Sequence, residues 1–87
     1  MAMYVVEVSA QARRNLKKLD PAVRRRIGAA LVSLTVDPRP VGTRALQGAK
    51  LGYLRIRVGD YRVVYTVEDD RLLVLIVDLG HRREVYR

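Results

Sequence analysis

The chain has 87 residues, and its 17 Lys and Arg against 9 Asp and Glu give a net charge of +8. A chain of this length forms one small hydrophobic core, so we expect a single domain over residues 1–87. It has no cysteine and one histidine, which excludes disulfides, thiolate catalysis and zinc sites built from cysteines or several histidines. The basic excess favours nucleic acid or an acidic protein as the partner.

The hydropathy pattern and the first residues bear on location. No apolar run reaches the roughly 18 residues of a membrane span, and the start of the chain has neither a basic segment nor a signal-cleavage pattern. We therefore expect a soluble cytoplasmic protein with no membrane partner. No residue pattern indicates a metal site or an organic cofactor, and we expect none.

The first half of the chain predicts one strand and two helices. Residues 3–8 are rich in valine and predict the strand. Ser9 is a suitable N-cap for a helix over residues 10–19, which are mostly good helix formers. The pair Asp20-Pro21 then starts a second helix, and the Asp-Pro-Arg-Pro run at residues 37–40 ends it. Two helices with so short a link predict a helical hairpin.

The second half alternates apolar and polar residues in the manner of strands. Residues 41–52 hold three glycines and predict a loop, and strands are expected at residues 53–58, 61–67 and 72–79. The predicted order is βααβββ. The fold class is α+β: an N-terminal strand and a helical hairpin that packs on one face of a mostly antiparallel, twisted sheet.

The predicted hairpin around Gly59-Asp60 has the most informative register. A two-residue turn there sets Val58 opposite Tyr61 and Arg57 opposite Arg62. Side chains alternate between the two faces of a strand. One face then receives the helices with six apolar or aromatic side chains: Leu54, Ile56, Val58, Tyr61, Val63 and Tyr65. The opposite face carries one tyrosine and three arginines: Tyr53, Arg55, Arg57 and Arg62.

Three arginines on one face allow two interpretations. They are ordinary solvated charges, or they form an anion site. Like charges directly opposite one another weaken a sheet by some tenths of a kcal/mol, up to about 1 kcal/mol. Guanidinium groups bind phosphate in a bidentate manner and stay charged at every accessible pH. We favour the anion site.

A further turn is expected at Asp69-Asp70, with Glu68 paired to Arg71 across it. This register sets three apolar side chains of the last strand behind the arginine face: Leu73, Leu75 and Val77. An apolar floor with an arginine rim suits stacked nucleobases or the apolar side of a partner helix.

The runs LQGAKLGYLRIRVGDYRVVYTV and VLIVDLGHRREVY, at residues 46–67 and 74–86, resemble the RelE/ParE superfamily of toxins from toxin–antitoxin systems. The RelE-type, ribosome-dependent messenger RNA interferases are the nearest match. The resemblance covers essentially the whole chain, and its most specific pieces are Leu46-Gln47-Gly48, the hairpin, the Gly-His-Arg run and the terminal Val-Tyr pair.

The resemblance implies which residues surround the scissile phosphate. Carried onto this chain, they are two basic residues of the first hairpin strand, one of the second, one after the last strand and a terminal tyrosine: Arg55, Arg57, Arg62, Arg82 and Tyr86. Family members often have lysines where Arg55 and Arg57 stand here. A lysine can act as a base and an arginine effectively cannot, so the general base stays open.

Proton transfer has several candidates. His81 has the only side chain that ordinarily titrates near neutral pH, and it is a candidate acid or base. Strand alternation puts His81 on the arginine face and Arg82 on the other, unless a bulge at Gly80 reverses them. Glu84 is an alternative base or a surface charge. Tyr86 is expected to stack on a base or donate a proton, or else to pack on the core.

The remaining aromatic and basic residues receive simpler interpretations. We expect Tyr61 and Tyr65 to pack in the core, and Tyr53 and Lys50 to contact the substrate. The basic clusters of the two helices are expected to be solvated, or to hold ribosomal RNA through its phosphates.

These features predict a type II toxin that cleaves messenger RNA in the ribosomal A site as a metal-independent endoribonuclease. The neighbouring 2′-hydroxyl would attack, and the arginines would stabilise the phosphorane. The expected partners are the ribosome, messenger RNA and a cognate RelB-like antitoxin with an acidic helical segment, in a hetero-oligomer. The alternatives are a ParE-like inhibitor of DNA gyrase and an inactive module that binds RNA or a partner.

Overall fold

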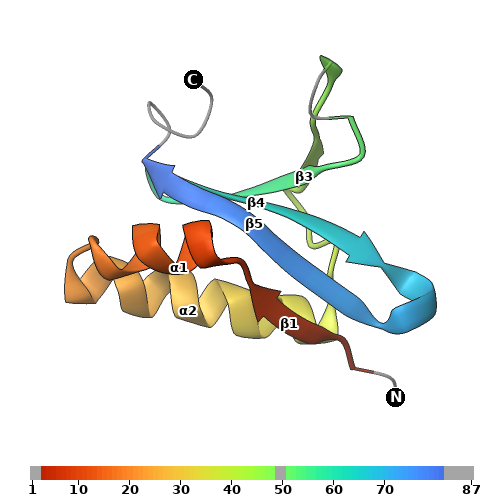
Figure 1. The fold of residues 1–87 in the computed structure, drawn as a ribbon, viewed down its shortest axis with the longest axis horizontal. Coiled ribbons are helices and arrows are strands. Elements are labelled where there is room, and N and C mark those ends of the chain that lie inside the picture. The colour runs from red at the N-terminus through yellow and green to blue at the C-terminus, as the bar shows by residue number, and fades with distance from the viewer. Residues whose placement is uncertain (1–2, 49–50, 82–87) are drawn as a thin grey trace.

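A computed structural model describes residues 3–48 and 51–81. Two helices cover one face of a five-stranded sheet, and no helix of the described residues lies on the opposite face (Figure 1). The predicted α+β class is confirmed. Within the two described ranges, no helix is both long and apolar enough to cross a membrane.

Both helices begin at the predicted signals. Helix α1, Ala10–Lys17, is capped by Ser9, whose Oγ accepts a hydrogen bond of 3.1 Å from the backbone N–H of Ala12. Helix α2, Pro21–Val36, has its proline at the first position, where no backbone N–H is needed. The apolar side of α2 supplies Ile27, Leu31 and Leu34 to the core. These three side chains lie in the hydrophobic core and hold α2 on the sheet.

The sheet has the order β1-β5-β4-β3-β2. Strand β1, Val5–Val8, lies parallel to β5, Leu73–His81, and the other neighbours are antiparallel. Strands β3, Leu54–Val58, and β4, Tyr61–Glu68, form the predicted hairpin. Strand β2, Arg44–Ala45, adds two residues of strand inside the predicted loop. The observed order therefore has one more strand than the predicted βααβββ.

The register of the β3–β4 hairpin is confirmed. Val58 lies opposite Tyr61 and Arg57 opposite Arg62. In the turn, Gly59 has a φ of 62° and Asp60 does not have a positive φ. A positive φ at the first of the two turn residues is the requirement that glycine satisfies in a type II′ hairpin.

The register of the β4–β5 hairpin differs from the prediction. Residues Asp69–Arg71 form a short 3₁₀ helix, η2, so Glu68 lies opposite Leu73 in the sheet. The expected contact between Glu68 and Arg71 exists as an ion pair of 3.3 Å within this turn, not across two strands. The longer turn shifts every later pair.

A second shift occurs in mid-strand. The pairing moves between Val64 and Tyr65, and Arg62 lies opposite Gly80. The predicted apolar floor beneath Arg62 is therefore wrong: its neighbour on β5 has no side chain. Leu73 and Leu75 do share the arginine face, but they lie farther along, opposite Glu68 and Thr66.

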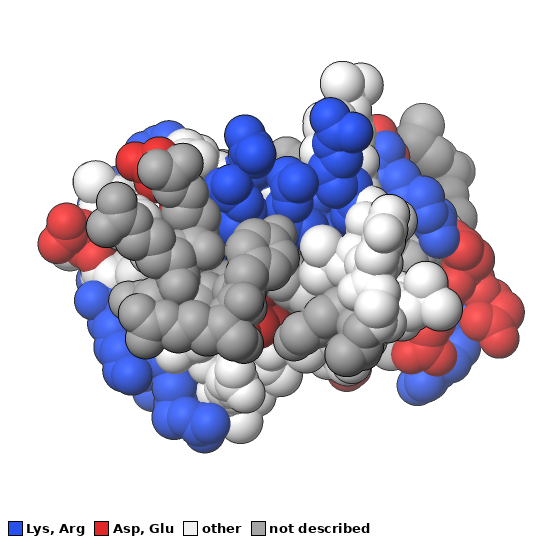
Figure 2. Space-filling model, turned by 90° about the horizontal axis from the view of Figure 1, so that it is seen from above, with Lys and Arg blue, Asp and Glu red and all other residues white. Residues whose placement is uncertain are grey.

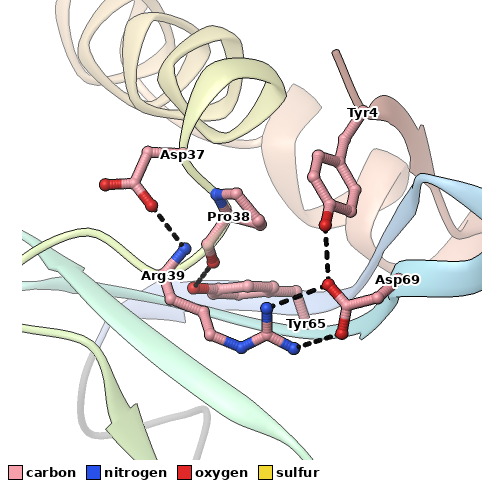
Figure 3. A network of polar contacts seen from close by, with 6 residues as sticks. All are labelled: Tyr4, Asp37, Pro38, Arg39, Tyr65 and Asp69. Carbon is pink, nitrogen blue, oxygen red and sulfur yellow. Dashed lines mark hydrogen bonds and ion pairs between the residues drawn. The ribbon is translucent and has the colours of Figure 1, made fainter. Parts of the chain in front are cut away.

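Asp69 ties together three distant parts of the chain (Figure 3). Its carboxylate accepts two hydrogen bonds from the Arg39 guanidinium, at 3.1 and 2.9 Å, and one from the Tyr4 hydroxyl, at 2.6 Å. These bonds, chiefly those from Arg39, lower the pKa of Asp69 from 3.8 to about 2. The charged carboxylate thus holds the start of β1 and the end of α2 to the β4–β5 turn.

Tyr65 anchors the same corner from inside the core. Its ring is fully buried, and its hydroxyl donates a hydrogen bond of 2.7 Å to the backbone oxygen of Pro38 (Figure 3). Burial raises the pKa of this hydroxyl. Tyr61 also packs against the core, half-buried, so both tyrosines have the structural positions that the sequence predicts.

Candidate anion-binding site

The three predicted arginines share the face of the sheet that the helices leave free. Arg55 and Arg57 alternate with the core residue Ile56 on β3, and Arg62 lies directly opposite Arg57. Figure 2 looks onto this face, and Lys and Arg side chains gather over its middle. The hairpin register thus brings these guanidinium groups together.

Arg62 is the most unusual of them, because it is a buried charge. It is 7% exposed, and its Nε has no hydrogen-bond partner. Among the described residues, the ion pairs are those of Arg39 with Asp69 and Arg71 with Glu68. Within that part of the chain, therefore, no carboxylate neutralises Arg62. A buried, unpaired charge is strongly unfavourable, which makes this position suited to binding an anion.

Arg55 and Arg57 extend the site toward the edge of the sheet. Arg55 is half-buried and its Nε also has no hydrogen-bond partner, whereas Arg57 is exposed. Both line a hollow of about 220 Å³, together with Gly42 and Arg44. Arg44 was not predicted as a site residue. It lies on β2, directly opposite Arg55, and the two-residue strand is hidden in a loop rich in glycine.

A second hollow, of about 290 Å³, adjoins the first. It lies between α2 and β3 and is lined by Ala30, Ser33, Ile56, Arg57 and the loop at residues 40–42. Arg57 and Gly42 line both hollows. The second hollow is thus a mainly apolar groove that adjoins the arginine-lined hollow at Arg57.

The arrangement fits one kind of chemistry. Guanidinium groups hold a phosphoryl group through paired N–H donors and neutralise charge that develops on it. They do not lose a proton at any accessible pH, so they cannot supply the base. The three arginines can therefore bind a phosphoryl group and stabilise negative charge on it. A reaction at that group that transfers a proton would need other side chains as acid and base.

His81 does not lie where strand alternation predicts. It pairs with Tyr61, which faces the helices, and the two rings meet edge to face with centroids 5.6 Å apart. The mid-strand shift opposite Val64 and Tyr65 reverses the faces of the residues that follow it on β5. Simple strand alternation is therefore wrong for His81. The alternative, an irregularity that reverses the faces, is present, but it precedes Gly80.

The other predicted site residues are placed unevenly. Tyr53 is half-buried just before β3, and its backbone oxygen accepts a hydrogen bond of 2.9 Å from the N–H of Leu46, which closes the preceding loop. Lys50, Arg82 and Tyr86 lie outside the described residues.

Comparison with known proteins gives consistent matches over nearly the whole chain. Residues 6–86 match the family described as "ParE toxin of type II toxin-antitoxin system, parDE". Toxin RelG of Mycobacterium tuberculosis is 36% identical over 89 residues, covering 97% of each chain. The messenger RNA interferase toxin RelE of Escherichia coli is 30% identical over 86 residues, covering 95% of this chain and 90% of that protein.

A solved structure supports the same fold. The toxin–antitoxin complex RelBE2 of Mycobacterium tuberculosis contains a chain that superposes with a TM-score of 0.84 at 28% identity. The match covers 93% of this chain and 100% of that one.

Proposed function

Because this chain belongs to the ParE toxin family of type II toxin–antitoxin systems, within the RelE/ParE superfamily, we propose that it is a messenger RNA endonuclease. It would cleave the message in the ribosomal A site. The relative from Escherichia coli is named a messenger RNA interferase, which supports this activity over the other functions in the superfamily.

The observation that carries the proposal is Arg62. A charge that is 7% exposed and has no carboxylate partner in residues 3–48 and 51–81 is poorly explained by stability. It is well explained by an anionic substrate, because the phosphate of RNA would supply the missing charge and accept the free N–H groups.

The mechanism follows from what arginine can do. The 2′-hydroxyl next to the scissile phosphate attacks the phosphorus, and Arg55, Arg57 and Arg62 stabilise the five-coordinate phosphorane. Proton transfer would fall to the segment that carries Arg82, Glu84 and Tyr86. Glu84, as the candidate base, would take the proton of the attacking 2′-hydroxyl, and Tyr86 would donate a proton to the leaving 5′-oxygen. No step requires a metal ion.

The proposal includes an antitoxin. The similar chain in the RelBE2 structure is part of a toxin–antitoxin complex, and this chain carries a net charge of +8. A RelB-like antitoxin with an acidic helical segment would complement that charge. Its apolar side would fit the groove between α2 and β3, and its acidic side would reach Arg57, where the groove meets the arginine cluster.

Primer extension on translating ribosomes tests the activity. Purified protein should create new message ends at A-site codons, and Arg62→Leu should form them about 10²–10³-fold more slowly. Arg71→Ala is the matched control, because it removes the same charge from a side chain that is already paired with Glu68. Intact messages with the wild-type protein would refute the proposal.

A second candidate is inhibition of DNA gyrase, which the family's ParE description favours. Supercoiling of relaxed DNA by gyrase, measured with the same preparations, separates the two functions. Inhibited supercoiling with intact messages would support gyrase as the target. Ribosome binding without either effect would indicate an inactive binding module.

A further inference from the structure

A fourth arginine joins the site through a strand that the sequence does not reveal. Strand β2 pairs with β3, and this pairing sets Arg44 directly opposite Arg55. Residues directly opposite in an antiparallel pair point to the same face, with Cβ atoms about 4.5–5.5 Å apart. Arg44 therefore belongs to the face that carries Arg55, Arg57 and Arg62.

The result is two pairs of like charges side by side. Arg44 opposes Arg55 across β2 and β3, and Arg57 opposes Arg62 across β3 and β4. Each pairing of like charges destabilises the sheet. In the described ranges no carboxylate lies within ion-pair distance of any of the four. The sheet thus concentrates four guanidinium groups without internal compensation.

The two pairs do not form one compact pocket. The hollow of about 220 Å³ is lined by Gly42, Arg44, Arg55 and Arg57, and Arg62 is not among its lining residues. Arg62 lies one strand farther, on β4, with Arg57 between it and the hollow. Each side holds one buried Nε without a hydrogen-bond partner, that of Arg55 and that of Arg62.

We propose that Arg44, Arg55 and the adjacent Gly42 form a second phosphate subsite, which holds the RNA phosphate next to the one bound at Arg62. This inference rests on the proposed function. Arg57 lies between the subsites and contacts both phosphates. The ligand is the backbone of single-stranded RNA, because residues on one face of a strand such as β3 repeat about every 6.4–6.8 Å along the chain, and arginines at such positions offer repeated anion contacts. Arg44 is a binding residue here, and it positions the strand for cleavage.

Binding of a short RNA tests the subsite without cleavage. The probe is a fluorescent single-stranded oligonucleotide with 2′-O-methyl groups, which removes the attacking hydroxyl. Anisotropy is measured at several salt concentrations for the wild-type protein, Arg44→Ala and Arg71→Ala. For single strands, each neutralised phosphate contributes about 0.7 to the slope of log K against log salt.

We expect Arg44→Ala to reduce the slope of log K against log salt by about 0.7 and to weaken RNA binding about 5- to 10-fold at low salt. Arg71→Ala, with the same change in net charge, should leave the slope unchanged. Because Arg44 is exposed at the edge of the sheet and lies opposite a like charge, its variant should unfold at the wild-type temperature or slightly above it. Equal slopes for both variants would overturn the subsite.

The two proposals fail separately. Arg44→Ala that binds like the wild type, with message cleavage intact, overturns the subsite and leaves the nuclease standing. An Arg44-dependent slope without cleavage by the wild type overturns the nuclease and keeps the subsite. A slope that does not change, together with an Arg44 effect only on antitoxin binding, would assign the hollow to an acidic peptide instead and overturn the RNA subsite.

Discussion

Two arginines, Arg39 and Arg62, show opposite ways of using the same side chain. Arg39 is half exposed, and both of its terminal nitrogens bond the carboxylate of Asp69. Arg62 is buried, and no described carboxylate forms an ion pair with it. The ion pair of Arg39 holds the segment after α2 to the β4–β5 turn, and solvent screens both of its charges. The second keeps a charge away from water without a partner, which costs stability and leaves the charge free for an anion.

The contrast extends to the regions around them. The Arg39 corner also has Tyr4 and Tyr65 with satisfied hydroxyl groups, so its polar atoms are accounted for (Figure 3). The arginine face holds two buried Nε atoms with no partner. In a domain this small, where stability is limited, the unsatisfied region is the one that function explains.

The largest expected effect separates the two arginines. Arg62→Leu should slow message cleavage by about 10²–10³-fold, the loss that follows removal of a group that stabilises developing charge. Its unfolding temperature should stay equal or rise, because an apolar side chain replaces a buried charge. Arg39→Leu should do the reverse, with normal cleavage and a lower unfolding temperature. Primer extension measures cleavage, and thermal unfolding measures stability. If the two variants lost cleavage to the same extent, or lost stability to the same extent, the two arginines would not have different roles.

The next effect concerns the buried end of the Arg39 corner. Tyr65→Phe removes the hydrogen bond to Pro38 and leaves a buried carbonyl without its donor. The free energy of unfolding should fall by about 1–3 kcal/mol. Urea denaturation measures the loss. Tyr4→Phe is the control: its hydroxyl is exposed, so its loss should be smaller. Equal losses of unfolding free energy in the two variants would show that the cost of losing the hydroxyl group does not depend on its burial.

The hairpin that builds the arginine face depends on Gly59. Gly59→Ala forces an alanine to a φ of 62°, and should reduce the free energy of unfolding by about 1–2 kcal/mol. The added Cβ would also lie 2.8 Å from Nη2 of Arg26, the end of a flexible side chain that can move aside.

Denaturation of the double variant separates the two causes. Gly59→Ala with Arg26→Ala removes the close contact and keeps the strained φ. We expect it to recover little of the loss. Full recovery would mean that the contact, not the backbone conformation, dictates glycine in this turn.

The parts of the fold and of the site that the sequence predicts are those with a long pattern of alternating apolar and polar residues or a strong local signal. The β3–β4 hairpin follows from a glycine turn and two alternating strands, so the register and both faces were predicted correctly. The starts of both helices and the end of α2 were also predictable, because Ser9, Pro21 and Asp37 are strong local signals. The end of α1 was not, since this helix stops at Lys17 and not at residue 19.

The errors lie where alternation is interrupted. The shift in β4–β5 pairing near Val64 moved His81 to the helix side, and nothing in the apolar run of β5 marks such a shift. Arg44 was missed because a two-residue strand carries no period. Its pairing with Arg55 depends on the loop that returns the chain to the edge of the sheet, and this is a tertiary feature.

The smallest expected effect is the pH dependence of the Arg39 corner. Asp69 has a pKa of about 2 in the folded protein, below its ordinary 3.8. A lowered folded-state pKa stabilises the fold above the ordinary value, and this contribution is lost as pH falls through the folded value. Between about pH 4 and pH 2 the wild type should therefore lose more stability than Asp69→Asn. Parallel curves for the two proteins would contradict the role of this carboxylate.

The central claim is that Arg55, Arg57 and Arg62, which have no ion-pair partner among the described residues, bind phosphate, whereas the ion-paired Arg39 does not. The Nε–H resonances of arginine, followed by NMR during titration with the 2′-O-methyl oligonucleotide, test it directly. We predict saturable shifts for Arg55, Arg57 and Arg62, with no shift for Arg39. Unchanged resonances on the arginine face, or a shift of Arg39 as large as that of Arg62, would contradict the account.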